Sequence, residues 1–112
     1  MNNETWILEA AIVPVEKMVS SGSASLSPWE VLVYCLWVAD YGMRNAGDLA
    51  AATDLHADFQ AEARRAAEYL ALPLTFDAFS LNQSQLEQQY FDRFESICNE
   101  IRRAEPGDTP KV

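Results

Sequence analysis

Histidine and cysteine, residues that often carry catalysis or hold a metal ion, are almost missing from this 112-residue sequence. It has one histidine, His56, and two cysteines, Cys35 and Cys98, and each cysteine lies within an apolar stretch. Two cysteines so far apart have neither the spacing of a zinc site nor that of a disulfide framework. We therefore predict no metal site and no cofactor, and we expect both thiols to be buried and reduced.

Recognisable enzyme motifs are missing as well. The sequence has no phosphate-binding loop, no dinucleotide-binding fingerprint and no Gly-x-Ser-x-Gly nucleophile elbow. On a helix, His56 would point away from Asp54 and Asp58, and no Glu-x-x-His pair is present to hold metals inside a bundle. The sequence favours a protein that is not an enzyme, with an enzyme of unrecognised type as the remote alternative.

Basic residues are scarce: eight Lys and Arg stand against seventeen Asp and Glu, for a formal net charge of −9. Such a chain repels DNA, RNA and anionic membranes, so direct nucleic-acid and membrane binding are disfavoured. A basic protein partner is favoured instead. Acidity that serves solubility alone is the other interpretation, and the sequence leaves both open. The first residues have neither a basic leader nor a long apolar run, so we expect no signal peptide, no membrane span and a cytoplasmic location.

Strand patterns are absent too, whereas helical spacings of apolar residues cover most of the chain. We predict an all-α protein: one domain over 1–104, a compact bundle of four to five helices, followed by a flexible tail over 105–112.

The first predicted helix, 4–19, contains a proline. Pro14 should kink or split this helix and push Val13 out of the α region. Residues 20–27 should form a flexible connection. The apolar face of the segment is Trp6, Ile7, Ala10, Ala11, Val15, Met18 and Val19.

The run 31–39 has no charged residue. Before it, Ser27 and Glu30 match a capping box and Pro28 stands at the first helical position, so a helix should begin at 28. It should end at Gly42 or in the Asn-Ala-Gly turn that follows, giving a helix over about 28–42. A helix apolar on every side must be covered on every side. We therefore place it at the centre of the bundle, with these core residues: Trp29, Leu32, Val33, Leu36 and Trp37.

Three more segments follow. Asp48 could cap a helix over 48–71, which is either one helix or two joined near Thr53 and Asp54. Residues 72–82 should be irregular or a single turn, and a last helix should cover 83–103. The two apolar stripes are Leu49, Ala52, Leu55, Phe59, Ala63, Ala66 and Leu70 in the first helix, and Leu86, Tyr90, Phe94, Ile97 and Ile101, widened by Phe91 and Cys98, in the last.

Asp54, Asp58 and Glu62 recur every four residues, so on one helix they would line one face. A row of carboxylates could imitate a phosphate backbone or dock on a basic protein. A merely solvated face is the other interpretation.

The turn after the apolar helix supplies a second group of candidates. Asp40 and Arg44 have the favourable order and spacing for an ion pair. Alternatively, Tyr41, Arg44, Asn45 and Asp48 form a surface patch that recognises a partner. The aromatic side chains of this helix are typical either of a core or of an interface, which keeps a homodimer open.

The stretches SPWEVLVYCLWVADYGMRNAGDLAAA and EQQYFDRFE resemble small helical bacterial domains of unknown function related to DNA-mimic proteins. The chain lacks their Asn-Gly-Gly-aromatic run. The resemblance implies an all-helical fold, no catalysis and a protein partner such as a DNA-binding regulator. Together with the charge, it leads us to predict a protein-binding domain of the DNA-mimic, immunity or regulator kind. A small oligomerising module that uses the apolar helix is the alternative.

Overall fold

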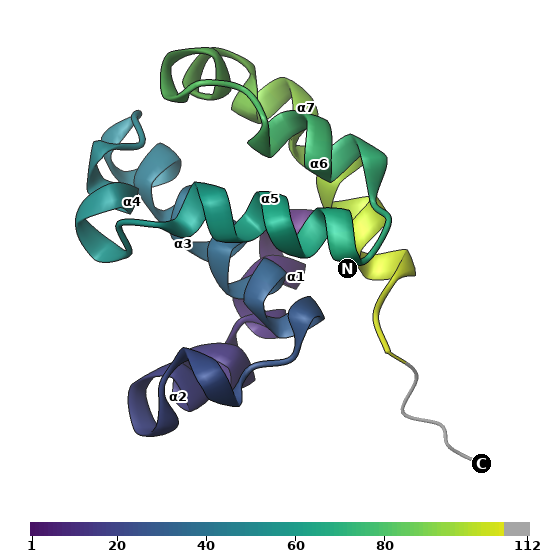
Figure 1. Ribbon diagram of the computed structural model, residues 1–112. Helices are drawn as coiled ribbons and strands as arrows, with labels where there is room; N and C mark the ends of the chain where they lie inside the picture. Colours follow the sequence, from purple (N-terminus) through teal and green to yellow (C-terminus); the bar gives the residue numbers. More distant parts are fainter. Residues whose placement is uncertain (107–112) are drawn as a thin grey trace.

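The computed structural model describes residues 1–106, so most of the predicted tail 105–112 lies outside the described residues. Within 1–106 the chain forms seven α-helices and one 3-10 helix and no strand, which confirms the all-α prediction (Figure 1). The helices are more numerous than expected because two predicted segments divide and 72–82 contains a short helix. Among residues 1–106, no helix is both long enough and apolar enough to cross a membrane.

The first predicted helix divides into α1 (Asn3–Ala10) and α2 (Ile12–Ser21). Pro14 is the third residue of α2, where a backbone N–H has no helical acceptor in any case, so the proline costs no hydrogen bond. The expected division is confirmed, but the prediction for Val13 is wrong, because it stays helical.

The connection from α2 to the next helix contains a 3-10 helix, η1 (Ser23–Ser25), where we expected a flexible segment. The Ser25 hydroxyl donates to the carbonyl of Gly22 at 2.7 Å, which holds this turn closed.

Helix α3 (Pro28–Ala46) begins where predicted, and both hydrogen bonds of the Ser27–Glu30 capping box are present. It ends at Gly47, which adopts the left-handed conformation at φ 77°, so the Asn-Ala-Gly turn stops the helix. Gly42 lies inside α3 instead of ending it. A Cβ at Gly42 would come within 3.0 Å of Ala52 and of the Asp48 carbonyl, so the glycine lets the following helix pack closely.

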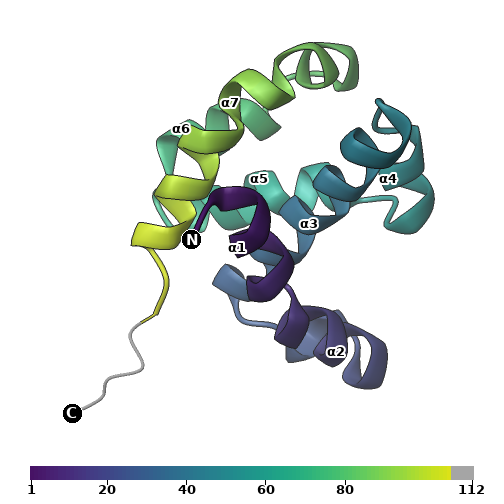
Figure 2. The same cartoon turned by 180° about the vertical axis from the view of Figure 1, so that it is seen from behind.

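Helix α3 is the central helix of the bundle, as predicted. It packs against α1 and α2 and against three later helices, α4, α5 and α7 (Figures 1 and 2). Of the run 31–39, only Val31 and Trp37 are partly exposed. Four of the five predicted core residues are therefore buried: Trp29, Leu32, Val33 and Leu36.

Residues 48–71 form two helices, α4 (Ala50–Leu55) and α5 (Phe59–Tyr69), which divide at 56–58 and not near Thr53 and Asp54. The N-cap position of α4 is Leu49, which makes no side-chain cap. Asp48, predicted to cap this segment, lies one residue earlier and accepts a hydrogen bond of 3.0 Å from the Ala50 N–H. Leu55, predicted on the apolar stripe, is the last residue of α4 and is 44% exposed, so the stripe expected of one continuous helix is interrupted there.

The last two helices are α6 (Pro73–Phe79), where we expected an irregular segment or a single turn, and α7 (Gln83–Arg103), which has the predicted bounds. All five residues of the α7 stripe are buried, and so is Cys98, whereas Phe91 is half exposed. Two carboxylates of α7 hold other helices at their starts. Glu100 accepts from the backbone N–H groups of Leu74 and Thr75 in α6, and Glu87 accepts from the N–H of Leu49.

Candidate functional site

The residues predicted to bind a partner lie in separate places. Tyr41, Arg44 and Asn45 line a pocket beside α1, whereas Glu62 lines a different pocket beside α5. Asp48 lies just before α4 and accepts a hydrogen bond from the Ala50 N–H, and the other two acids, Asp54 and Asp58, are exposed near the connection between α4 and α5.

The predicted row of carboxylates is wrong in its geometry. Asp54 belongs to α4, Asp58 to the connection, and Glu62 to the first turn of α5, so the three do not share one helical face. The division occurs at His56, whose Nε2 lies 2.9 Å from the Glu62 carboxylate. The His56 ring also packs edge-on against Tyr34 of α3, with 5.4 Å between centroids. These contacts hold the connection between α4 and α5 in a turn. The helix is therefore interrupted, and the three carboxylates do not form the row that a continuous helix would have given.

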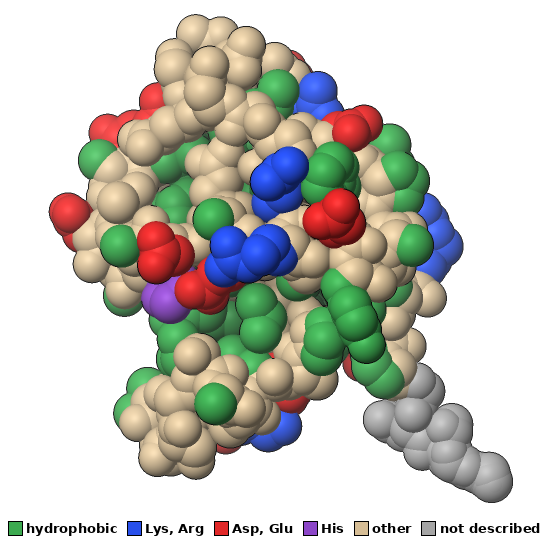
Figure 3. All heavy atoms as spheres, viewed as in Figure 1, with side chains coloured by type: hydrophobic (Ala, Val, Ile, Leu, Met, Phe, Trp, Pro, Cys, Tyr) green, Lys and Arg blue, Asp and Glu red, His purple; other side chains and the backbone are tan. Residues whose placement is uncertain are grey.

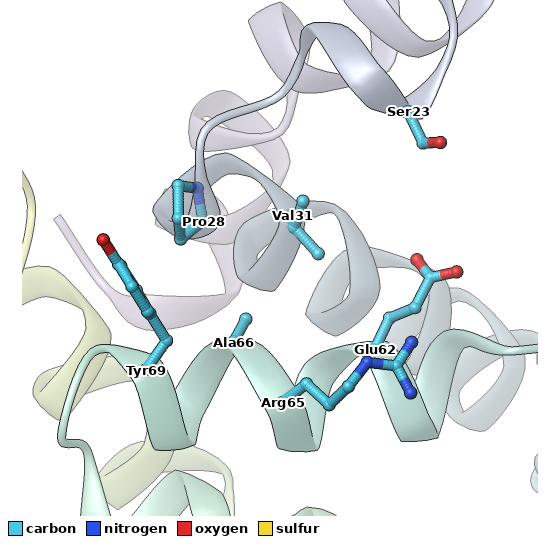
Figure 4. Close-up of a pocket in the computed structure, with 7 residues that line it drawn as sticks. All are labelled: Ser23, Pro28, Val31, Glu62, Arg65, Ala66 and Tyr69. Carbon is cyan, nitrogen blue, oxygen red and sulfur yellow. The ribbon is translucent and has the colours of Figure 1, made fainter.

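A pocket of about 350 Å³ lies between η1, the start of α3 and α5. Figure 4 shows Val31 of α3 pointing toward Ala66 of α5, with Tyr69 at one end and Glu62 and Arg65 at the other. The space-filling view shows this part of the molecule hollowed between α5 and α2, with hydrophobic side chains inside it (Figure 3). Along one edge of the hollow, acidic side chains lie beside basic ones, so this face carries no continuous acidic patch (Figure 3).

Helices α1 and α2 pack against α3 (Figure 2). A second hollow is lined by residues of this part of the fold. It consists of two adjoining pockets of about 260 and 270 Å³ that share Leu8 and Trp37. We call their lining the α1–α3 groove: Glu4, Leu8, Ala11, Ile12, Val15, Glu16, Trp37, Asp40, Tyr41, Arg44 and Asn45.

The ion pair predicted at the end of the apolar helix is confirmed. Arg44 Nε lies 3.0 Å from both oxygens of Asp40, which is almost completely buried. The guanidinium also lies over two aromatic rings, 4.9 Å from the centroid of Phe94 and 5.2 Å from that of Phe91. Asp40 therefore has the partner that a buried carboxylate requires. Arg44 is one-third exposed and can still face the groove.

Trp37 lies in the middle of a short aromatic series on α3. Its ring centroid is 6.0 Å from that of Tyr34 and 6.2 Å from that of Tyr41. Tyr34 is buried, Trp37 is partly exposed and Tyr41 is 46% exposed, so the series runs from the core to the surface. The aromatic side chains thus serve both the core and the groove.

Both thiols are buried and free, as predicted. Burial raises the pKa of Cys98 to about 12 and raises the pKa of Cys35 further still. Both groups are therefore protonated at neutral pH and poor nucleophiles. No cluster of metal-ligating side chains occurs within residues 1–106.

The chain matches no protein-family model, and comparisons with curated proteins and with solved structures found no match.

Our reading of the sequence missed the residues of the groove that come from the first segment. Leu8 and Ile12 are more than half exposed, and they stand outside the apolar face predicted for 4–19. Apolar residues on the polar side of an amphipathic helix are a sequence signal for a second apolar surface. Val19, predicted on the apolar face, is 84% exposed because α2 extends beyond the rest of the bundle.

Proposed function

We propose that this protein is a non-enzymatic binding domain of the cytoplasm whose acidic surface engages a basic protein. A DNA-binding protein is one such partner, because its basic surface, which accepts a phosphate backbone, can also accept carboxylates. Immunity and regulator proteins that act on basic partners belong to the same class.

One observation carries the proposal: within residues 1–106, most of the carboxylates are exposed and form no ion pair with a described basic side chain. Within residues 1–106, ion pairs involve only four acids: Glu4, Glu30, Asp40 and Glu62. A larger set is exposed outside these pairs: Glu9, Glu16, Asp54, Asp58, Glu68, Asp77, Asp92, Glu95 and Glu105. Carboxylates that do not serve internal ion pairs remain available to attract a basic partner.

Self-association through the apolar helix has less support. The chain itself covers α3, and the run 31–39 leaves only Val31 and Trp37 partly exposed. A helix buried in its own monomer offers little apolar area to a second copy.

Capture of proteins from the native cell extract at low and high ionic strength tests the proposal. We expect basic proteins to be retained at low salt and released at high salt, because exposed charges are screened. A variant with Glu9, Glu16, Asp54 and Asp58 changed to amides should retain less of the same proteins. Capture that is indifferent to salt and to these changes would contradict the proposal.

A further inference from the structure

The α1–α3 groove combines an apolar floor with acidic ends. Leu8 and Trp37 form its middle, where the two pockets meet, and Ile12 extends the apolar surface along α2. Leu8 is 58% exposed and Ile12 is 54% exposed, so both apolar side chains are available to a partner.

The two ends of the groove carry net negative charge. At one end, Arg44 forms a close ion pair with Asp40 and lies 3.6 Å from Glu4, so two acids face one base. At the other end, Glu16 is exposed and no described basic side chain is within ion-pair distance of it. A partner that complements this lining would carry positive charges on either side of an apolar surface.

The groove also contains the residue types that dominate binding energy in protein interfaces. Trp37, Tyr41 and Arg44 lie on successive turns of α3, and tryptophan, tyrosine and arginine are the residues most enriched at such positions. The hollow beside α6, about 310 Å³, has two acids, Glu68 and Asp77, but lacks an exposed tryptophan or tyrosine. It therefore provides a matched control surface.

We propose that the α1–α3 groove docks an amphipathic helix of the partner, with apolar side chains against Leu8, Ile12 and Trp37 and with Lys or Arg opposite Glu4 and Glu16. A helix fits because apolar side chains at spacings of three and four residues form one stripe, which can fill a groove between helices. The inference rests on the proposed function, and it assigns both the site and the chemistry of the partner segment.

Tryptophan fluorescence can report docking at this site directly. The other two tryptophans, Trp6 and Trp29, are 7% and 8% exposed, whereas Trp37 is partly exposed. The probe is a synthetic helical peptide with leucines on one face and lysines flanking that face. Its binding should shift the emission to shorter wavelength and protect Trp37 from acrylamide. A twin peptide with glutamates in place of the lysines should not bind.

Variants then locate the site. Leu8→Ser, followed by Trp37 fluorescence, and Trp37→Ala, followed by calorimetry because it lacks the reporter, should each weaken peptide binding by about tenfold or more. Leu74→Ser, which changes an exposed leucine of α6, should leave binding unchanged. The pair Glu4→Gln and Glu16→Gln should weaken binding and reduce its salt dependence, whereas the pair Glu68→Gln and Asp77→Asn should not. Leu8 and Glu16 are exposed, so their variants test the site even if Trp37→Ala does not fold.

Four results would overturn the inference. The first is that the glutamine variants of Glu4 and Glu16 affect binding no more than the control variants of Glu68 and Asp77. The second and third are that the glutamate peptide binds, or that the lysine peptide does not. The fourth is that Trp37 becomes protected by a second copy of the chain as the protein concentration rises. Equal effects would still leave salt-dependent capture of basic proteins intact. The proposed function would then stand without this groove. Loss of that capture itself would remove the proposed function.

Discussion

The hydroxyl of Tyr90 in α7 donates a hydrogen bond of 2.7 Å to Oδ1 of Asp40 in α3, fifty positions away in the chain. The same carboxylate accepts the guanidinium of Arg44. One buried acid thus joins the central helix to the last helix and holds an arginine at the edge of the α1–α3 groove.

Tyr90→Phe removes this hydrogen bond but keeps the ring, and it should lower the free energy of unfolding by about 1.5–3 kcal/mol, the range for a hydrogen bond to a charged group. Burial, and then the charge of Asp40, raise the pKa of Tyr90 well above its usual value. The folded state therefore holds this proton more tightly than the unfolded state does. The stabilisation should be complete below about pH 10 and should be lost as the pH rises further. Urea unfolding of both proteins across this range should show their difference shrinking at high pH. A constant difference would contradict the assignment.

Arg44→Ala leaves Asp40 buried without its ion pair. We expect a loss of stability toward the lower end of the ~3–5 kcal/mol seen for fully buried pairs, because Arg44 is partly exposed. Arg44→Lys keeps the charge but loses the planar contact with Phe94, so it should recover only part of that stability. Urea unfolding measures both variants, and binding of the lysine peptide is measured in parallel. Loss of stability with unchanged binding would assign Arg44 a structural role alone.

Glu30 contributes to stability in its charged form. Burial acts to raise its pKa, but hydrogen bonds from Ser27 and the charge and hydrogen bonds of Lys17 together lower it. Because the folded pKa is depressed, the stabilisation is present above the usual pKa and is lost as the pH falls through the folded value. Glu30→Gln should cost about 0.5 kcal/mol at neutral pH, since Lys17 is partly exposed. Thermal unfolding should show the two proteins converging in acid. If Lys17→Gln has an effect that simply adds to that of Glu30→Gln, the two side chains are not coupled.

Ala71 adopts a left-handed conformation at φ 58° between α5 and α6. Backbone hydrogen bonds from Ala71 to Glu68 and from Leu72 to Ala67 close the turn around it, the pattern in which glycine is usual. Ala71→Gly should therefore stabilise the protein by about 0.5–1 kcal/mol, after the added freedom of the unfolded chain is counted. Gly47→Ala, at φ 77°, should destabilise it by a similar amount. Urea unfolding measures both variants. A change of the unfolding midpoint in the same direction for both would contradict this account.

Gly42→Ala tests the close packing of α3 against α4. Alanine favours a helix over glycine by about 1 kcal/mol, but its Cβ would meet backbone atoms of Asp48 and Ala52 at 3.0 Å. Overpacking of this kind costs about 1–3 kcal/mol, so we expect a net loss of stability of about 1 kcal/mol. Urea unfolding decides the sign. An increase in stability would mean that the short α4 moves away without cost.

Local features of the sequence were sufficient to predict the two longest helices. The start of α3 follows from Ser27, Pro28 and Glu30, which interact within one turn. The bounds of α7 and its buried stripe follow from residues three and four apart on one helix. The all-α class and the ion pair between Asp40 and Arg44 were predictable for the same reason, because each depends on neighbours in sequence.

Contacts between distant residues decided the rest. Helix α6 begins where Glu100, twenty-five positions from Thr75, accepts its first N–H groups, and no local pattern contains that carboxylate. The division of 48–71 depends on His56 meeting both Glu62 and Tyr34, and it separates the acids that a continuous helix would have aligned. The sequence by itself determined the two longest helices and the stripe that α7 buries, because these features rest on local hydrogen bonds and spacing. The tertiary structure alone decided where helices break and which apolar residues stay exposed, because those depend on side chains that only folding brings together.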